Sequence, residues 1–284
     1  MMRTILITGA TSGLGYALAH RCAEDGVHLI LHGRDPLRLA STAKSVQTGH
    51  SDVRVTTVTA DLSELHQVRE MADQIREINN QLDVLVNNAG IGFGKPEGSE
   101  RRVTADGVEL RFAVNYLAGF LLTIELLPLL RRTRGARVVN VASIGQQAID
   151  FDDLMIERGY SGIRAYSQSK LAQIMMAMEL GERLPAAEVT FNSVHPASYM
   201  PTKMVLLELG THVDSLDEGV ASVYRLVSDP ELATVTGKFF DRTAPAEVDP
   251  QAYERAARHE LLRQSLRLIG NCHSTRDSIE PLDI

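Results

Sequence analysis

Short apolar runs that alternate with helix-like segments limit the fold of this 284-residue chain more than any other feature. Each run is followed by a segment with helical periodicity, which is the order expected for βαβ units. Several runs are apolar almost throughout, as expected for parallel strands that helices cover on both faces. The sequence therefore predicts an α/β fold with a doubly wound parallel sheet of about seven strands. The runs from which we infer it span residues 4–8, 27–32, 53–59, 82–86, 137–141 and 189–194.

One domain is expected to account for the whole chain. Hydrophobic residues make up 44% of the sequence and charged residues 23%, values that are ordinary for a globular protein. We find no internal repeat and no linker rich in Pro, Gly or Ser. We therefore predict a single domain over residues 1–284, in which residues 249–284 form a C-terminal helix and tail.

Charge and hydropathy exclude several classes of partner. The formal net charge of -7 gives nucleic acid no long-range attraction. The most apolar run, 120–130, contains Glu125 and Pro128 and falls short of the roughly 20 residues that span a bilayer. We expect a buried helix there, with no nucleic-acid partner and no membrane partner.

The chain also carries features of a cytoplasmic protein. It has two cysteines, Cys22 and Cys272, whereas a secreted disulfide scaffold normally has more. The N-terminal Met1-Met2-Arg3 leads at once into the first apolar run and leaves no room for a signal peptide. A cytoplasmic location is therefore the expectation.

A glycine-rich turn, Thr8-Gly9-Ala10-Thr11-Ser12-Gly13-Leu14-Gly15, lies between the first apolar run and the first predicted helix. Glycines there let backbone N–H groups and the positive end of the helix approach a phosphate. A glycine pattern alone also fits a simple connection, but this one has a strand before it and a helix after it. We expect the turn to bind the diphosphate of a dinucleotide through Gly9, Thr11, Ser12, Gly13, Leu14 and Gly15.

The TGxxxGxG spacing of this turn resembles the short-chain dehydrogenase/reductase family, whose fold is of the Rossmann type. Asn87-Asn88-Ala89-Gly90, after the fourth run, matches the family's NNAG segment. The resemblance implies that Asn88, Ala89 and Gly90 stabilise the sheet and contact the adenosine half of a dinucleotide. It also places Asp61 and Leu62 where the family contacts the adenine ring.

The end of the second run indicates which dinucleotide binds. NAD-binding proteins of this fold place an acid there, on the ribose 2′-hydroxyl. This chain reads His32-Gly33-Arg34, with no carboxylate, and a guanidinium suits a 2′-phosphate. We therefore predict that NADP(H) is preferred over NAD(H). The alternatives left open are a solvated Arg34 and a pair between Arg34 and Asp35.

Tyr166 and Lys170 form a YxxxK pair, and residues four apart share one helix face. An ammonium beside a phenol favours the phenolate, so we expect Lys170 to lower the pKa of Tyr166. Alone, such a pair is more often a surface feature. Ser143, however, follows the fifth run at the carboxyl edge of the sheet, where open α/β proteins bind ligands.

The resemblance assigns roles to these residues. Ser143 polarises the substrate oxygen, Tyr166 transfers the proton, Lys170 holds the nicotinamide ribose, and Asn115 supports a water-mediated proton relay. Tyr166, Lys170 and Pro196 are also implied to contact the cofactor. Pro196-Ala197 departs from the family's Pro-Gly, and Thr202 matches its downstream threonine only loosely. The implied activity is hydride transfer between a nicotinamide and a small-molecule carbonyl or alcohol.

Residues 143–166 enclose an insertion that contains Phe151-Asp152-Asp153-Leu154 and resembles the retinol dehydrogenase and protochlorophyllide reductase branch. That branch implies a lipophilic substrate, over which segment 198–212 is a candidate lid. The methionines at 175, 176 and 178 fit core packing better than a subunit contact. The family's use of this helix nevertheless implies a homodimer or homotetramer.

No cluster of His, Cys and carboxylates has metal-ligand spacing, so we expect no metal. Two alternatives to a reductase remain open. One is a regulatory protein that senses a dinucleotide without catalysis, because fold alone does not fix function. The other is a family member that runs epimerisation or dehydration.

Overall fold

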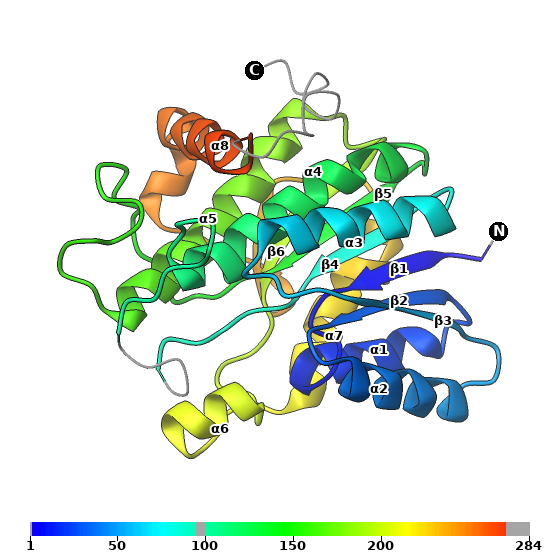
Figure 1. Cartoon of the computed structure of the whole chain (residues 1–284). Coiled ribbons are helices and arrows are strands. Elements are labelled where there is room, and N and C mark those ends of the chain that lie inside the picture. Colours follow the sequence, from blue (N-terminus) through cyan, green and yellow to red (C-terminus); the bar gives the residue numbers. More distant parts are fainter. Residues whose placement is uncertain (1, 95–99, 271–284) are drawn as a thin grey trace.

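The computed structural model describes residues 2–94 and 100–270, and a single eight-stranded sheet lies at its centre (Figure 1). The strand order is β3-β2-β1-β4-β5-β6-β7-β8. Only β8 (Ala244–Pro245) runs antiparallel to its neighbour. The predicted doubly wound α/β fold is confirmed, with β7 and β8 added to the six expected runs. The parallel strands are β1 (Thr4–Ile7), β2 (His28–Gly33), β3 (Arg54–Thr59), β4 (Val84–Asn87), β5 (Ala136–Val141), β6 (Val189–His195) and β7 (Lys238–Asp241).

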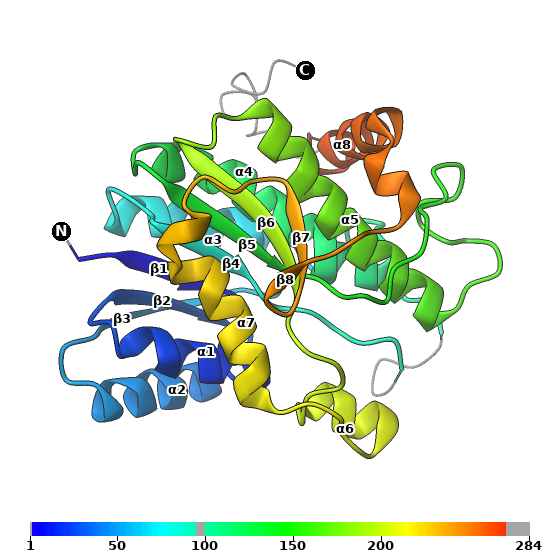
Figure 2. The same ribbon diagram turned by 180° about the vertical axis from the view of Figure 1, so that it is seen from behind.

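Helices cover both faces of this sheet (Figures 1 and 2). One face carries α1 (Gly13–Ala23), α2 (Pro36–Gly49) and α7 (Leu216–Ser228). The opposite face carries α3 (Leu65–Ile78), α4 (Ala118–Arg131) and α5 (Gly162–Arg183). Figure 2 shows α6 (Lys203–Leu209) standing apart from both layers. The remaining helical elements are the π-helical η1 (Phe112–Leu117), the 3-10 turns η2 (Pro230–Leu232) and η3 (Pro250–Tyr253), and α8 (Arg255–Gly270), which packs against α5.

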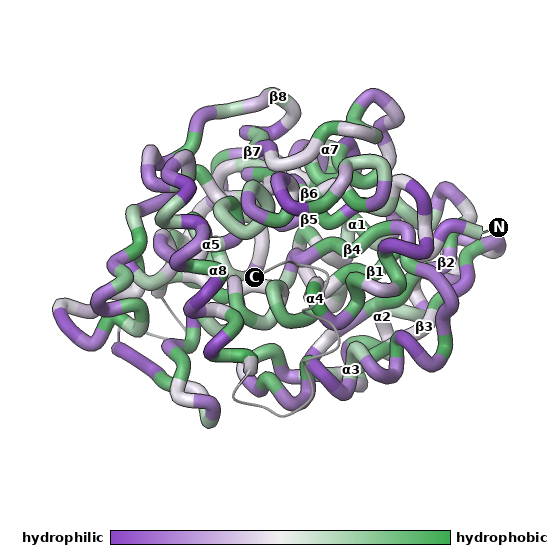
Figure 3. The backbone as a smooth tube through the Cα atoms, turned by 90° about the horizontal axis from the view of Figure 1, so that it is seen from above, coloured by the Kyte–Doolittle hydropathy of each residue, from purple (hydrophilic) through white to green (hydrophobic). Residues whose placement is uncertain are grey.

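The core lies on both sides of the sheet because alternate strand residues point to opposite faces. In β1, Leu6 belongs to the cluster under α3, α4 and α5, whereas Ile5 and Ile7 belong to the cluster under α1 and α7. Figure 3 shows hydrophobic stretches gathered around the central strands and α4, while α3 alternates between hydrophobic and hydrophilic residues. These two apolar layers hold the sheet rigid beneath the loops at its carboxyl edge.

Strand register brings the predicted site segments to one edge. Ile7 of β1 is level with Val86 of β4, and Asn87 of β4 is level with Asn140 of β5. The glycine turn, the segment after Asn87 and Ser143 therefore all leave the sheet at the same edge. The strand order also reverses between β1 and β4, and such a switch point is where open α/β sheets bind ligands.

Two predicted helix boundaries and one predicted buried helix are confirmed. Gly26 has a φ of +63°, the left-handed conformation expected after α1. Ser215 and Glu218 form the predicted capping box of α7, which ends one residue beyond the expected Val227. The span Phe112–Arg131 is long and apolar enough to cross a membrane, but 83% of its apolar 18-residue window is buried inside the protein. It serves as a core helix. Cys22 is buried, and Cys272 lies outside the described residues.

The C-terminal helix covers α5. Met175 and Met176 are buried between these two helices, beside Leu261 and Leu262 of α8, which confirms the packing interpretation for both methionines. Tyr116 in η1 adds a hydrogen bond of 2.7 Å to the Ser265 hydroxyl. Helix α8 therefore covers the face of α5 that carries these methionines. The homodimer or homotetramer stays a prediction. The expected tail, residues 271–284, lies outside the described residues.

Candidate active site

The glycine turn after β1 is closed so tightly that side chains would not fit. Gly9 and Gly13 have φ values of +67° and +53°, which residues other than glycine rarely adopt. A Cβ on Gly15 would collide with the Gly9 carbonyl oxygen, and one on Gly33 would collide with Thr11. The backbone is therefore exposed at the start of α1 because the glycines leave it uncovered.

The start of α1 has free capacity to bind an anion. Ser12 is the N-cap residue, with extended backbone, yet its side chain makes no capping hydrogen bond. The first turn of α1 contains no acid, so nothing offsets the positive end of the helix. Leu14 of this turn packs into the core behind it. The turn thus fits the diphosphate of a dinucleotide, with the first N–H groups of α1 and the Ser12 hydroxyl as donors.

The Asn87–Gly90 segment clamps this turn to the sheet. The Thr8 hydroxyl accepts hydrogen bonds from the backbone N–H groups of Asn88 (2.9 Å) and Ala89 (3.0 Å). The Asn88 side-chain amide donates to the Thr8 carbonyl oxygen at 2.8 Å. The Asn87 amide donates across to Asn140 Oδ1 at 2.9 Å and so links β4 to β5. These bonds provide the sheet stabilisation that the resemblance implies.

His32 is a further support of the turn that sequence reasoning missed. Its Nδ1 accepts from the Gly9 backbone N–H at 3.2 Å, and its Nε2 lies 3.0 Å from the Ala60 carbonyl oxygen. Only a neutral imidazole with its proton on Nε2 satisfies both contacts. Burial lowers the pKa of His32, which favours that neutral form. The sequence signal was present, since His32 is a polar residue inside an apolar strand.

Two arginines lie near the turn, Arg34 just after β2 and Arg38 on α2. Arg34 is 74% exposed and lies 3.7 Å from Asp61 Oδ2. Asp35 instead caps α2 by accepting from the N–H groups of Leu37 and Arg38, so the alternative pair between Arg34 and Asp35 is not observed. Arg38 donates to the Thr11 carbonyl oxygen at 3.4 Å. The possible role of Arg38 was not inferred from the sequence, although Arg38 follows Arg34 closely, in the first turn of α2.

Of the two residues after β3 that were expected to contact the cofactor, only one has an accessible side chain. Leu62 is buried in the core cluster beneath α3 and α4. Asp61 accepts from the Ser63 hydroxyl at 2.7 Å and faces Arg34. Only Asp61 of this pair therefore presents its side chain toward the arginines.

Ser143, Tyr166 and Lys170 lie together at the carboxyl edge of the sheet. The Ser143 hydroxyl, just past β5, lies close enough to the Tyr166 phenol to lower its pKa, and it accepts from the Gly145 N–H at 3.0 Å. Lys170, one turn further along α5, places Nζ 5.6 Å from the centroid of the Tyr166 ring. Its buried ammonium donates to the Val141 carbonyl oxygen (2.8 Å) and to Gln173 Oε1 (2.9 Å). The site thus brings together a phenol that can donate a proton (Tyr166), a hydroxyl that can donate a hydrogen bond (Ser143) and a buried amine (Lys170).

The expected lowering of the Tyr166 pKa by Lys170 is not found in this structure. Burial raises the pKa of Tyr166 above its usual value of 10, and this outweighs the lowering by the Ser143 hydrogen bond. The ammonium of Lys170 is directed to Val141 and Gln173 instead of the phenol oxygen. Burial also lowers the pKa of Lys170 to about 7, which weakens its positive charge near neutral pH.

Asn115 lies in η1 and uses its side chain to hold the neighbouring backbone. Its Oδ1 accepts from the Ile91 N–H at 2.8 Å, and its Nδ2 donates to the Ile91 carbonyl oxygen at 3.1 Å. The second amide hydrogen goes to the Ser169 hydroxyl of α5 at 3.0 Å. Asn115 therefore joins η1, residue 91 and α5. The water-mediated relay implied for Asn115 stays a prediction.

We expect the buried lysine to make stability depend on pH. Its pKa of about 7 in the folded chain is below the usual lysine value of 10.5, so the unfolded chain binds more protons between these two pH values. The free energy of unfolding that neutral Lys170 contributes is therefore greatest above about pH 10.5. It falls as the pH drops from 10.5 to about 7. From pH 7 to 9, the cofactor-free protein should gain about 2 kcal/mol of unfolding free energy relative to Lys170→Met. Urea unfolding of both proteins measures this difference. The exposed Lys44→Met is the control, and an equal pH dependence in wild type and Lys170→Met would contradict the assignment.

The sequence of the chain is similar to known proteins along most of its length. The family model described as short chain dehydrogenase matches residues 3–207. The chain belongs to the short-chain dehydrogenase family. It is therefore an NAD(P)-dependent dehydrogenase or reductase.

Curated relatives identify the branch of this short-chain dehydrogenase. Retinol dehydrogenase 13 of Homo sapiens is 33% identical over 291 residues, which cover 94% of this chain and 85% of that protein. Polyprenol dehydrogenase of Mus musculus is 33% identical over 286 residues, covering 94% and 84% of the two chains. The resemblance to the retinol dehydrogenase-like branch, inferred from the insertion before Tyr166, is confirmed.

Solved structures support the fold and the cofactor class of this short-chain dehydrogenase. A short chain dehydrogenase from Salmonella enterica superposes with a TM-score of 0.70 at 25% identity, covering 85% of this chain and 96% of the other. The RhlG/NADP complex of Pseudomonas aeruginosa superposes with a TM-score of 0.67 at 26% identity, covering 84% and 94%. The chain thus has the architecture of nicotinamide dinucleotide-binding members of the family.

The region after β6 shows how this member departs from the family's Pro-Gly. Ala197, which follows Pro196, is buried in the core beneath α7. His195 Nε2 lies 3.2 Å from the Ser198 hydroxyl. Thr202 is the N-cap of α6, and its methyl group lies beside Gly13 of the phosphate-binding turn. The 198–212 segment therefore begins at the cofactor turn.

In the described part of the chain, no group of three or more His, Cys, Asp or Glu residues could hold a metal ion.

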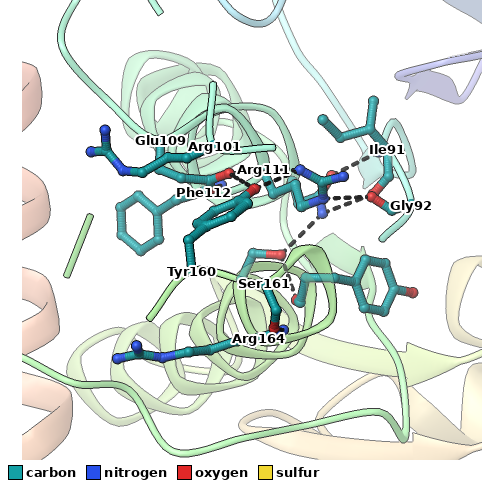
Figure 4. Close-up of polar contacts among 12 residues, drawn as sticks. Ile91, Gly92, Arg101, Glu109, Arg111, Phe112, Tyr160, Ser161 and Arg164 are labelled. Atoms are coloured by element: carbon teal, nitrogen blue, oxygen red, sulfur yellow. Dashed lines mark hydrogen bonds and ion pairs between the residues drawn. The ribbon is translucent and has the colours of Figure 1, made fainter. Parts of the chain in front are cut away.

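A buried polar cluster next to the site was also missed from sequence (Figure 4). The Tyr160 hydroxyl, at the end of the insertion, accepts from Arg111 Nη1 at 2.7 Å and donates to Glu109 Oε1 at 2.9 Å. Arg111 Nε donates to the Gly92 carbonyl oxygen at 2.7 Å. Glu109 and Arg111 are both fully buried. The insertion thus fixes residue 92, two residues beyond the NNAG segment.

Proposed function

We propose that this chain is an NADP(H)-dependent oxidoreductase that interconverts a ketone or aldehyde and an alcohol on a lipophilic small molecule. The observation that carries the proposal is the assembly of Ser143, Tyr166 and Lys170 at the sheet edge that also holds the glycine turn. A dinucleotide bound at the turn and a carbonyl bound at the phenol would then share one edge of the sheet.

The residues divide the chemistry in a simple way. When bound, the nicotinamide supplies or accepts hydride. Tyr166 protonates the substrate oxygen in the reductive direction and takes the proton back in the oxidative direction. Ser143 donates a hydrogen bond to the same oxygen and stabilises its developing charge. Lys170, held by Val141 and Gln173, adds positive charge near the phenol when protonated and would hold the ribose of a bound nicotinamide.

Preference for NADP(H) is supported by charge at the end of β2. No carboxylate stands at the position after Gly33, and the exposed Arg34 is turned toward Asp61 over 3.7 Å, a separation that binds it weakly. Arg38 lies close by on α2, against Thr11 of the turn. Two guanidinium groups suit a 2′-phosphate, and the structurally similar RhlG of Pseudomonas aeruginosa forms a complex with NADP.

Replacing both arginines by alanine tests this preference. Loss of charge-assisted hydrogen bonds to the 2′-phosphate should weaken NADP(H) binding about 10- to 100-fold in Arg34→Ala/Arg38→Ala. Binding of NAD(H), which has no such phosphate, should change little. Titration calorimetry with all four cofactor forms measures both effects, and Arg21→Ala, at the far end of α1, is the control for the loss of an arginine remote from the turn. Tighter binding of NAD(H) than of NADP(H) by the wild-type protein would refute the preference.

A lipophilic substrate is supported by the apolar surroundings of the phenol. Phe93 packs edge-on to Tyr166, with ring centroids 5.9 Å apart and planes at 76°. Tyr199 lies close enough to raise the pKa of Tyr166. On α6, Leu206, Leu207 and Leu209 are exposed. Retinol and polyprenol, which name the curated relatives, are lipophilic alcohols.

A further inference from the structure

Glu208 on α6 is a partly buried carboxylate that no role described above uses. On this short helix the leucines at 206, 207 and 209 are exposed, whereas Glu208 turns inward, the reverse of a usual amphipathic helix. Its Oε1 accepts from the Gly94 backbone N–H at 2.8 Å, and the Phe93 N–H donates to the same side chain. The carboxylate therefore links α6 to the segment of residues 92–94, named here the 92–94 platform.

The 92–94 platform is shaped to receive this carboxylate. A Cβ on Gly92 would collide with Glu208 Oε1, and one on Gly94 would lie 3.4 Å from Glu208 Cγ. Both glycines thus leave room that a larger side chain would take. Burial raises the pKa of Glu208, whereas the N–H groups of Gly94 and Phe93 and the charge of Arg111 lower it and so favour the ionised carboxylate.

Buried contacts fix the 92–94 platform from below (Figure 4). Arg111, which is fully buried, donates to the Gly92 carbonyl oxygen at 2.7 Å and is itself bonded to Tyr160. Gly162, the first residue of α5, packs so closely on the Phe93 carbonyl oxygen that a Cβ there would collide with it. The platform therefore offers Glu208 a fixed partner, and α6 is the element that this contact holds in place.

Glu208 also lies near the reacting phenol. Phe93, between the two glycines of the platform, packs directly against Tyr166. The negative charge of Glu208 raises the pKa of Tyr166, as does Tyr199, while the Ser143 hydrogen bond lowers it. Arg111 attracts Glu208 electrostatically, but its Nε donates its hydrogen bond to the Gly92 carbonyl oxygen. A substrate at Tyr166 therefore meets a negative charge.

We propose that Glu208 is a specificity-determining residue, which holds α6 against the 92–94 platform and excludes substrates that carry an anionic group near the reacting carbonyl. This inference rests on the proposed carbonyl-alcohol activity. Like charges disfavour the wrong partner through repulsion in a partly desolvated site. The enzyme would thus accept neutral lipophilic carbonyl compounds and alcohols. It would discriminate against carbonyl compounds and alcohols that also carry a carboxylate near the reacting carbon.

A matched substrate pair tests the proposal. We would measure kcat/KM with NADPH for a long-chain 4-oxo fatty acid, whose carboxylate lies close to the reacting carbonyl, and for its methyl ester, in wild type, Glu208→Gln and Glu208→Asp. Glu208→Gln should raise the acid-to-ester ratio about 10-fold or more, since one like-charge contact is removed. Glu208→Asp, which keeps the charge, should retain most of the discrimination. Glu24→Gln, which changes an exposed carboxylate at the C-cap of α1, is the control and should leave the ratio unchanged.

Two further readouts separate the possible outcomes. In Glu208→Gln the pH limb assigned to Tyr166 should move to lower pH with the ester, because a charge that raises the pKa of Tyr166 is gone. Amide exchange at Gly94 should accelerate in Glu208→Ala, whether or not any substrate turns over. An unchanged acid-to-ester ratio in Glu208→Gln, or unchanged Gly94 exchange in Glu208→Ala, overturns the inference. A wild-type protein that turns over neither substrate, nor any other carbonyl, counts instead against the proposed function.

Discussion

Tyr166→Phe should lower kcat by about 10²- to 10⁴-fold, the range in which positioned proton transfer contributes to catalysis. The substitution removes the only phenol oxygen hydrogen-bonded to Ser143 in the described site and leaves the ring to pack on Phe93. Affinity for NADP(H) should hardly change, because the glycine turn and the arginines after β2 are untouched. Steady-state kinetics and cofactor titration of the same preparation measure the two effects separately.

The control for this substitution is Tyr253→Phe, which removes the hydroxyl of a half-exposed tyrosine bonded to Glu247. It should retain wild-type turnover. Near-normal turnover by Tyr166→Phe would mean that another group delivers the proton, and the assignment of Tyr166 would be wrong.

Arg111→Ala should cause the largest loss of stability, about 3–5 kcal/mol, because it leaves a buried carboxylate without its cation. Glu109 is fully buried and reaches Arg111 chiefly through the Tyr160 hydroxyl, since the direct contact between the two charged groups spans 3.9 Å. The same change frees the Gly92 carbonyl oxygen from its 2.7 Å hydrogen bond. Urea unfolding at neutral pH gives the difference in unfolding free energy.

Two variants control for other causes of this loss. Arg131→Ala breaks a half-exposed pair with Glu188 and should cost at most about 1 kcal/mol. Arg111→Met combined with Glu109→Leu removes both charges and should recover most of the stability, because no unpaired ion is left in the core. A loss in Arg111→Ala no larger than in Arg131→Ala would show that the buried cluster does not hold this part of the fold.

The sheet and the cofactor turn could be predicted because their signals are local. Most strands of the parallel sheet are buried, largely apolar runs, and Gly9, Gly13 and Gly15 mark a turn whose neighbours exclude side chains. The YxxxK pair was readable for the same reason, since one helical turn brings Tyr166 and Lys170 to the same side of α5. Ser143 joined them because carboxyl ends of parallel strands meet at one edge.

What escaped prediction depends on contacts between distant residues. Arg111 and Tyr160 are 49 residues apart and neither belongs to a motif, so no local pattern pairs them. Glu208 and Gly94 are 114 residues apart, and the hydrophobic pattern of α6 alone would have turned its leucines inward. The direction of the Tyr166 pKa was also mispredicted, because burial depends on packing around the ring and not on the spacing to Lys170.

The central claim is tested most directly by following NADPH and substrate together in one reaction. Purified protein is mixed with NADPH and a panel of lipophilic aldehydes and ketones, and NADPH loss and product alcohol are both quantified. We predict one alcohol formed for each NADPH oxidised, with NADH far less effective. Conversion of substrate without net loss of NADPH, or tight NADPH binding without conversion of any carbonyl or alcohol, would contradict the account.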